Sequence, residues 1–210
     1  MLTCQTKTPI LDIKSNLMTS IAVLPFTNMS TEENNQFFCD GISEQIISAL
    51  SKIEQLKVTS RTSSFFFKEK KLPLKEIANQ LDVTVLLEGS VRLGGDKMRI
   101  TAQLIDVADD AHFWSESWDR SRDDLFDVQD EISLLIADRL REHMGHFDID
   151  DHLVNKQTDD INAYEWYLKG RFHYVKWNPE DCNTSIKYYQ KALDIDPEMI
   201  DALVGLADSY

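Results

Sequence analysis

The stretch "VTVLLEGSVRLGGDKMRITAQL", residues 83–104, alternates apolar and polar side chains on both sides of a glycine pair. Its first half has apolar or small residues at odd positions, and its second half has apolar residues at even positions. A two-residue turn at Gly95 and Asp96 joins two antiparallel strands in which the numbers of facing residues sum to 191. The pairs that face each other on the apolar side are Leu93 with Met98, Val91 with Ile100, Gly89 with Ala102, and Leu87 with Leu104. A shift of one residue would mix the two faces, so the pattern predicts one register, and a glycine first in the turn favours type II′.

The glycines of this stretch also admit a different interpretation. Gly89 and Gly94 are separated by four residues, which is the spacing of a phosphate-binding P-loop. A P-loop continues with lysine and then serine or threonine, and it opens a helix. Here Gly95 and Asp96 follow Gly94, Lys97 comes two positions late, and the next residues alternate as in a strand. We therefore assign the glycines to a hairpin turn and to close packing.

Shorter patterns on both sides of the hairpin predict the rest of a sheet. Strands are expected at 20–26, 56–60 and 112–118. Helices are expected at 34–53, 74–81 and 123–144, where apolar residues recur every three or four positions. The order β-α-β-α-β-β-β-α contains two strand-helix-strand crossovers followed by a meander. It predicts an α/β fold with a mixed β-sheet and helices packed against it.

The character of the chain changes near its ends. Residues 1–18 read as a polar leader or linker, and 19–144 hold the expected α/β domain. Residues 145–158 have little periodicity and many acids, which is typical of an acidic linker. Residues 159–210 are helical in pattern and rich in aromatic side chains.

The helical part resembles tetratricopeptide repeats (TPR), in which each repeat is a 34-residue pair of helices. The residues that match the repeat pattern are Trp166, Gly170, Tyr189, Ala192 and Pro197, followed in the next repeat by Leu203, Leu206, Ala207 and Tyr210. Trp166 and Gly170 lie about three residues further upstream than the pattern requires, so a longer connection between the two helices is expected. We expect one repeat and the first helix of a second, incomplete repeat, as part of a longer protein.

The α/β part, residues 20–142, resembles the TolB N-terminal-like (FlgO-like) domain of bacterial signalling proteins. The segments that carry the resemblance are "IAVLPFTNMS", "FFCDGISEQIISAL", "LKVTSRTSSF", "IANQLDVTVLLEGSVR", "RITAQLIDV", "HFWSESWDR" and "LFDVQDEI". In that family the domain commonly precedes TPR repeats and often follows a nucleotide cyclase or a CadC-like winged-helix domain. The resemblance implies a non-enzymatic regulatory or interaction module.

Composition narrows the class of partner. The 210 residues carry a net charge of −14, and nucleic acid binding needs a basic face, so we expect no direct nucleic acid partner. No apolar run approaches the length of a membrane span and no signal peptide is visible, so we expect a cytoplasmic protein. A periplasmic location fits if the full-length protein carries a membrane segment upstream. The three cysteines show no metal-binding or disulfide spacing.

Polar residues at the carboxyl ends of the first two strands form a candidate ligand site. In open α/β sheets, ligands bind outside the carboxyl ends of parallel strands. The candidate residues at these ends are Asn28, Ser30, Asp40, Arg61 and Ser63. Arg61 with nearby N–H groups suits a small anion. The alternative is that these side chains satisfy the loop backbone and that Arg61 pairs with an acid.

The aromatic helices form a second candidate site. A protein-binding groove is expected around Trp166, Tyr167, Phe172, Tyr174 and Trp177, which would hold a peptide or a second copy of the chain. Some of these aromatic residues must instead pack against the second helix or the α/β domain.

The sequence lacks the motifs of catalytic and metal sites. No nucleophile motif is present, so we expect no enzyme activity and no cofactor. The stretch "HMGHFDIDDH", residues 143–152, offers histidines and aspartates, but it lacks the glycine and glutamate of a calcium loop, and we expect no metal site. The favoured function is a regulatory module whose TPR segment binds a protein. The alternative is a sensor of an anionic or nucleotide-like small ligand at the strand ends.

Overall fold

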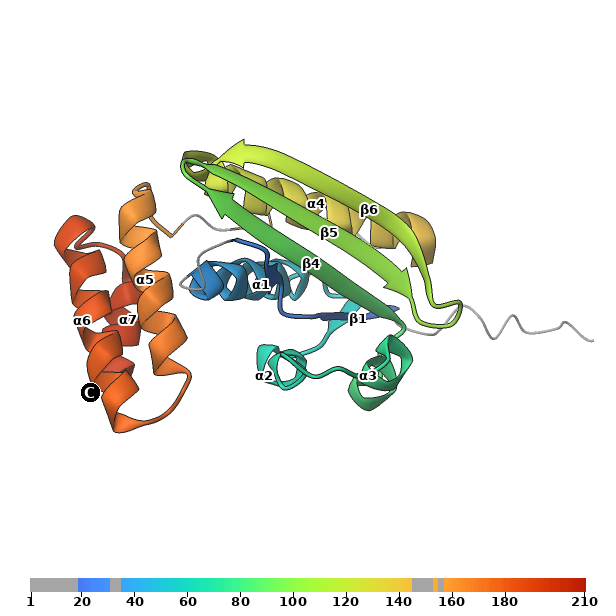
Figure 1. Cartoon of the computed structure of the whole chain (residues 1–210), viewed down its shortest axis with the longest axis horizontal. Coiled ribbons are helices and arrows are strands. Elements are labelled where there is room, and N and C mark those ends of the chain that lie inside the picture. The colour runs from blue at the N-terminus through green and yellow to red at the C-terminus, as the bar shows by residue number, and fades with distance from the viewer. Residues whose placement is uncertain (1–18, 31–34, 145–152, 155–156) are drawn as a thin grey trace, which may run out of the picture.

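A computed structural model of the chain describes residues 19–30, 35–144, 153–154 and 157–210. It contains a β-sheet with helices packed against it, followed by three further helices at one end of the molecule (Figure 1). This is the mixed α/β architecture that the order of sequence patterns predicts.

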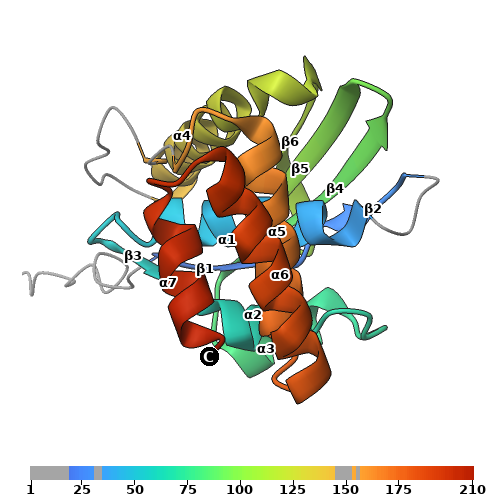
Figure 2. The same cartoon turned by 90° about the vertical axis from the view of Figure 1, so that its left-hand side faces the viewer.

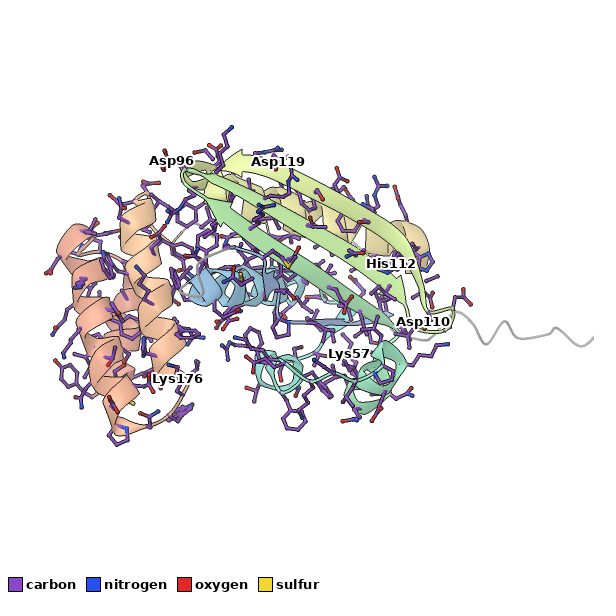
Figure 3. All side chains as sticks on the ribbon, in the orientation of Figure 1. Lys57, Asp96, Asp110, His112, Asp119 and Lys176 are labelled. Atoms are coloured by element: carbon purple, nitrogen blue, oxygen red, sulfur yellow. The ribbon has the colours of Figure 1, made fainter. Side chains whose placement is uncertain are left out.

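The sheet has a parallel half and an antiparallel half. Its strands are β1 (Thr19–Val23), β2 (Thr27–Asn28), β3 (Leu56–Val58), β4 (Val85–Gly94), β5 (Lys97–Asp106) and β6 (Ala111–Ser121). They lie in the order β3-β1-β4-β5-β6, and the short β2 pairs with β4. Strands β3, β1 and β4 run parallel, whereas β4, β5 and β6 form an antiparallel meander. Figure 3 shows Asp96 and Asp110, which mark the two turns of the meander, at opposite ends of the long strands.

The β4–β5 hairpin has the register that the sequence predicts. The facing pairs include Leu93 with Met98 and Leu87 with Leu104. Gly95 has a φ of +60°, the left-handed conformation that a type II′ turn needs at its first central residue. The close packing assigned to Gly89 is also present, because a Cβ there would lie 2.3 Å from the ring of Phe26.

The helices of the α/β part cover the two faces of the sheet unequally. They are α1 (Gln36–Leu50), α2 (Arg61–Phe65), α3 (Leu74–Leu81) and α4 (Leu125–Met144), the last preceded by a 3₁₀ turn, η3 (Arg122–Asp124). Helices α1 and α4 bury the apolar side of the hairpin in the main core. On the opposite face, Ala22, Leu86 and Ile105 of the strands form a smaller core with Ile77 and Ala78 of α3 and with Leu24, Phe67 and Val83. The rest of that face presents polar side chains of β4, β5 and β6.

Several predicted elements differ in their bounds. The strand expected at 56–60 ends at Val58, and the strand expected at 112–118 spans Ala111–Ser121. The strand expected at 20–26 ends at Val23, because Pro25 has no N–H to donate to a neighbouring strand. The chain resumes pairing as β2, and the N–H of Phe26 between them donates to Ser43 Oγ at 2.8 Å. The loop expected after the second strand begins helix α2 instead, since Ser60 caps it by accepting from the N–H of Ser63.

The C-terminal helices are α5 (Ile161–Tyr174), α6 (Pro179–Ile195) and α7 (Ile200–Asp208). Asp160 caps α5 and Asn178 caps α6, with Pro179 at the first helical position of α6. The buried ring of Tyr189 on α6 packs where a Cβ at Gly170 or Gly205 would collide with it, at 2.6 Å in each case. The two glycines therefore let α5 and α7 approach α6 closely.

The segment expected as a linker lies mostly outside the described residues. Of its described part, Leu153 is buried in the main core, and the N–H groups of Leu153 and Val154 donate to Asp130 Oδ1 at 3.1 and 3.0 Å. The ammonium of Lys52 also donates to the Leu153 carbonyl. At this point the chain is packed against the α/β part rather than free of it.

Candidate functional site

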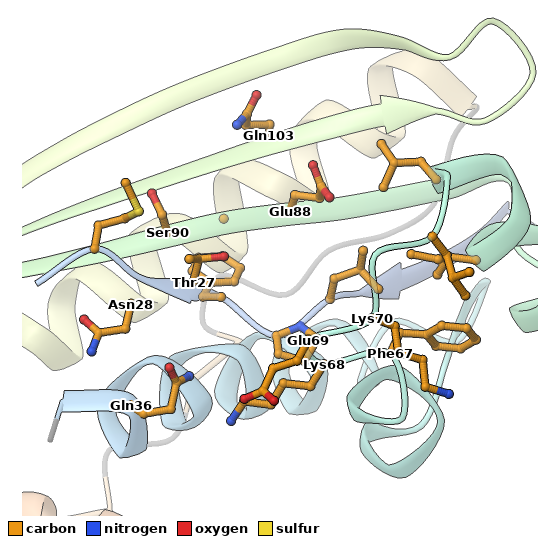
Figure 4. Close-up of a pocket in the computed structure, with 18 residues that line it drawn as sticks. Thr27, Asn28, Gln36, Phe67, Lys68, Glu69, Lys70, Glu88, Ser90 and Gln103 are labelled. Atoms are coloured by element: carbon orange, nitrogen blue, oxygen red, sulfur yellow. The ribbon is translucent and has the colours of Figure 1, made fainter. Parts of the chain in front are cut away.

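A cavity of about 560 Å³ opens at the carboxyl end of β1. Its walls come from residues 24–29 after β1, the loop 67–74 before α3, and the polar face of β4 and β5 (Figure 4). The connection from β1 runs through α1 on one face of the sheet, and the connection from β3 to β4 runs through α3 on the other. The cavity thus lies at the point where the connections leave the sheet in opposite directions, which is where open α/β sheets bind ligands.

One wall of the strand-end cavity is a polar cluster on the sheet. Glu88 and Ser90 project from β4, and Gln103 faces Glu88 from β5 (Figure 4). Burial raises the pKa of the Glu88 carboxyl, and the nearby His112 partly opposes this effect. The cluster lies next to Gly89, whose missing side chain leaves room for Phe26 beneath the cavity.

Asn28 and Ser30 stabilise the rim of the cavity. Asn28 lines the cavity, and its Oδ1 accepts from the N–H of Ser30 at 2.9 Å. Ser30 Oγ accepts from the N–H of Leu93 at 2.8 Å. These two predicted site residues therefore hold the loop after β2 against β4.

Asp40 contributes to the site through Lys68. The Nζ of Lys68 donates to both carboxylate oxygens of Asp40, at 2.7 and 2.8 Å, and Gln36 Nε2 donates to Oδ1 at 2.8 Å. Lys68 and Gln36 line the cavity, whereas Asp40 is buried behind them. The Asp40 carboxylate of α1 therefore neutralises the charge of the Lys68 ammonium.

Arg61 and Ser63 lie outside the lining of this cavity. Arg61 Nε donates to Glu44 Oε2 at 3.1 Å, and its guanidinium lies 4.0 Å from the centre of the Phe65 ring. Ser63 donates its N–H to the capping Ser60. The structure therefore brings Asn28 and Ser30 together, places Asp40 beside them through Lys68, and puts Arg61 and Ser63 on a separate helix.

The helical segment is fixed to the α/β part by apolar packing. Tyr164 of α5 is fully buried, with its ring centre 4.8 Å from that of Phe126, and burial raises its pKa to about 12. Leu168 covers Gly41 of α1 so closely that a Cβ there would lie 2.7 Å from its side chain. Figures 1 and 2 show α5 against α1, with α6 and α7 further out.

Two ion pairs flank this apolar contact. Arg171 of α5 donates to Glu44 of α1, which also accepts from Arg61. Arg122 of η3 donates to Glu165 of α5. The helical segment is thus tied to the α/β part on both sides of Leu168.

The five aromatic residues of the predicted groove divide between two sides of α5. Tyr167 and Tyr174 line a cavity of about 320 Å³ between α1, α5 and α7. Trp166 and Phe172 line a second cavity, of about 600 Å³, between α5, α6 and the start of α1. Trp177 follows α5, is 75% exposed, and lies 5.2 Å from Tyr174 between ring centres. The structure therefore does not bring the five into one groove.

Exposed apolar side chains gather on the helical segment. Among the described residues, the large apolar side chains with high exposure in this segment are Trp177, Ile195, Ile200, Leu203, Val204 and Tyr210, against Met29 and Phe66 elsewhere. Three of them, Ile200, Leu203 and Val204, belong to α7, where they are 72%, 47% and 53% exposed. This face of α7 is an uncovered apolar surface.

Several charged residues that the structure places in cavities were not indicated by the sequence, among them Glu88, Lys169 and Lys191. Glu88 lies in the strand-end cavity, and Lys169 and Lys191 lie in the cavity beside Trp166. The alternation of the hairpin assigns Glu88 to the polar face, but no spacing links it to the loop that covers it. The two lysines are on different helices, so only their packing brings them together.

The structure also places His143, which the sequence offered as a metal ligand. Its ring stacks on Phe113 with 3.9 Å between centres, and its Nε2 lies 3.1 Å from Asp106 Oδ2. This contact lowers the pKa of the Asp106 carboxyl. Within the described residues there is no group of three metal-ligating side chains, and the rest of the histidine-rich stretch lies outside them.

The fold defines a class of protein: a mixed-sheet α/β domain with further helices fixed to its first helix. The chain belongs to the family described as "HilA/YgeH-like transcriptional regulator, second domain", which matches residues 17–135. A regulatory role follows from this membership. No helix in the described part is long and apolar enough to cross a membrane.

A curated relative extends the similarity into the helices. The chain is 36% identical over 188 residues to "Putative adenylate cyclase 3" of Rhizobium meliloti, which covers 90% of this chain and 32% of that protein. The chain therefore spans about a third of the length of the relative it matches.

Solved structures with a similar fold include TolB- and LpoB-like domains. TolB from Acinetobacter baumannii has 15% identity and a TM-score of 0.44, covering 62% of this chain and 30% of that one. Lipoprotein GNA1162 from Neisseria meningitidis has 17% identity and a TM-score of 0.43, covering 59% and 99%. The LpoB C-terminal domain from Salmonella enterica has 15% identity and a TM-score of 0.39, covering 50% and 83%.

Proposed function

We propose that this chain is a non-catalytic regulatory module of a longer signalling protein, in which a TPR-like helical segment binds a protein partner. The observation that carries the proposal is the exposed apolar face of α7, formed by Ile200, Leu203 and Val204. An apolar face of this kind on a packed helix is typical of a surface that another helix covers. Both the following helix of a repeat and a helix of a partner have the required chemistry.

The docking of α5 supports this proposal. Packed side chains and ion pairs between a protein-binding segment and the rest of a molecule can carry energetic coupling between the two. Leu168 packed on Gly41, and the ion pair between Arg171 and Glu44, provide that connection to α1. The family description and the cyclase relative fit a module that acts on an output domain elsewhere in the longer protein.

The chemistry of the buried residues supports a non-catalytic role. A nucleophilic cysteine needs an accessible thiolate. Cys39 is buried, and burial together with the neighbouring Asp40 raises the pKa of its thiol to about 12. Two acids near the strand ends are paired with bases, Asp40 with Lys68 and Glu44 with Arg61.

The proposal is tested by placing a photocrosslinking amino acid at position 203 of the full-length protein in cells. We expect adducts with a specific partner protein, and their loss when Ile200→Glu is added. Adducts with a later helix of the same protein alone would assign the α7 face to the packing of the repeats and would also contradict the proposal. Ser117 is the control position, because it is exposed on the polar face of the sheet. Equal adduct patterns at positions 203 and 117, or adducts that Ile200→Glu leaves unchanged, would contradict the proposal.

The strand-end cavity supports a second candidate function, a sensor of a small ligand. The observation in its favour is the half-buried Glu88 carboxyl at the wall of the 560 Å³ cavity, with a raised pKa and with Ser90 and Gln103 beside it. Native mass spectrometry of the purified chain, compared with its denatured mass, tests this function. A bound small molecule that Glu88→Gln removes would support it, and a ligand-free wild-type chain purified from its native host would count against it.

A further inference from the structure

The second cavity beside α5 lies where the helical segment meets the α/β part. It has a volume of about 600 Å³ and is lined by the start of α1, by Arg122 of η3, and by residues of α5 and α6. Four aromatic rings, those of Phe37, Trp166, Phe172 and Tyr188, form its apolar walls. Figure 1 shows α5 between α6 and α1, the three helices that contribute residues to the lining.

Two lysine ammonium groups converge on one aromatic ring in this cavity. The Nζ atoms of Lys169, on α5, and Lys191, on α6, each lie 4.2 Å from the centre of the Trp166 ring. The distance between the two Nζ atoms is therefore at most twice the distance from either atom to the ring centre. The Trp166 ring is held in place by stacking on Tyr188, with 5.6 Å between ring centres and an angle of 19° between planes.

These ammonium groups lack an acidic partner. In the part of the chain that the structure describes, no carboxylate oxygen lies within 4.0 Å of Lys169 or Lys191. Arg122, the third cation in the lining, is paired with Glu165. The cavity lining therefore has two lysine ammonium groups without a carboxylate partner, Lys169 half-buried and Lys191 exposed, on a chain whose net charge is −14.

The electrostatics of Lys169 agree with this geometry. Burial lowers the pKa of its ammonium, and the charges of Arg122 and Lys191 lower it further. The charged form of Lys169 is stabilised when an anion enters the cavity, because the anion relieves the repulsion between the cations. By contrast, Arg61 and Lys68 at the strand ends already have Glu44 and Asp40 as partners.

We propose that this junction cavity binds a small phosphate monoester with an aromatic or apolar body, its dianionic phosphate held by Lys169 and Lys191. Two positive charges match the charge of a phosphate monoester near neutral pH, and lysine binds phosphate as a compact point charge. The four rings around the lysines suit a planar or apolar body. This site is separate from the proposed partner surface on α7 and does not rest on it.

The proposal is tested by isothermal titration calorimetry of the purified chain with phenyl phosphate, inorganic phosphate and phenol. We expect phenyl phosphate to bind with a dissociation constant of roughly 1 mM or tighter, inorganic phosphate to bind more weakly, and phenol to show no saturable binding. Lys169→Gln and Lys191→Gln should each weaken phenyl phosphate binding by about tenfold, because each removes a charge-assisted hydrogen bond. Circular dichroism confirms that each variant is folded.

Lys187→Gln is the matched control. Lys187 is an exposed lysine one turn before Lys191 on α6, so this substitution removes the same charge outside the cavity. It should leave the affinity within about twofold of the wild type, because it alters only long-range, screened electrostatics. Failure of the wild-type chain to bind phenyl phosphate would overturn the proposal. So would equal affinities in the wild type, Lys169→Gln and Lys191→Gln, or phenol binding as tightly as phenyl phosphate.

Discussion

Gly89 and Phe26 show how one missing side chain shapes the strand-end cavity. Phe26 is buried after the proline that ends β1, and its ring occupies the space above Gly89 on β4. Any larger residue at position 89 must move a ring that is only 1% exposed. Phe26 also belongs to the residues that line this cavity, as Glu88 does.

We predict that Gly89→Ala destabilises the protein by about 1–3 kcal/mol, the usual range for inserting a group into a packed core. The added Cβ lies 2.3 Å from the Phe26 ring, and buried surroundings prevent the ring from turning away. Urea denaturation measures the change in the free energy of unfolding. Gly94→Ala on the same strand is the control, because a Cβ there has no neighbouring atom within 4 Å. Similar stabilities of the two variants would contradict the prediction.

At the scale of elements, the hairpin could be predicted because two independent patterns agree on it. The apolar faces of 83–93 and 98–104 match in only one register, and the turn residue Gly95 fits the same register. The positions of the helices at 36–50, 74–81 and 125–144 follow similarly from apolar residues that recur every three or four positions, although α1 is buried on nearly all sides. Local periodicity was sufficient for these elements.

Elements whose form depends on residues distant in the sequence were harder to predict. The break between β1 and β2 is stabilised by Ser43 of α1, which accepts from the N–H of Phe26 and donates to the Cys39 carbonyl. No pattern near Phe26 indicates this partner. Likewise, the sequence left open whether Arg61 faces a ligand or pairs with an acid, and it could not name the acid, Glu44 on α1, to which Arg61 donates. Glu44 is 17 residues away in sequence, and only the packing of α1 beside α2 brings the two together.

At the scale of the whole molecule, Glu44 connects three elements. It lies on α1, and its carboxylate accepts from Arg61 of α2 and from Arg171 of α5. The aromatic residues of α5 were expected to form one groove, but docking against α1 divides them between two cavities. The same docking creates the junction cavity and leaves α7 exposed at the outside. The arrangement of the helical segment on α1 therefore determines which surfaces are available to a ligand or partner.

We predict that Glu44→Gln loosens the helical segment without unfolding the sheet. The substitution keeps the side-chain shape but leaves two guanidinium groups facing each other without an anion. The cost should be on the order of 1 kcal/mol, because all three side chains are about a quarter to a third exposed and solvent screens the charges. Hydrogen exchange should accelerate in α5, α6 and α7, and stay unchanged in β4 and β5.

Glu142→Gln is the control for this prediction. Glu142 also pairs with an arginine, Arg139, but both lie on the exposed side of α4 within one helix turn. Its loss removes the same charge from the chain and breaks no connection to α5, so exchange in α5–α7 should remain at the wild-type rate. If Glu44→Gln instead accelerates exchange equally in β4 and α5, the helical segment and the sheet open as one cooperative unit. The connection through Glu44 would then stabilise the whole fold rather than the position of the helices, because selective loosening requires the helices to open while the sheet stays closed.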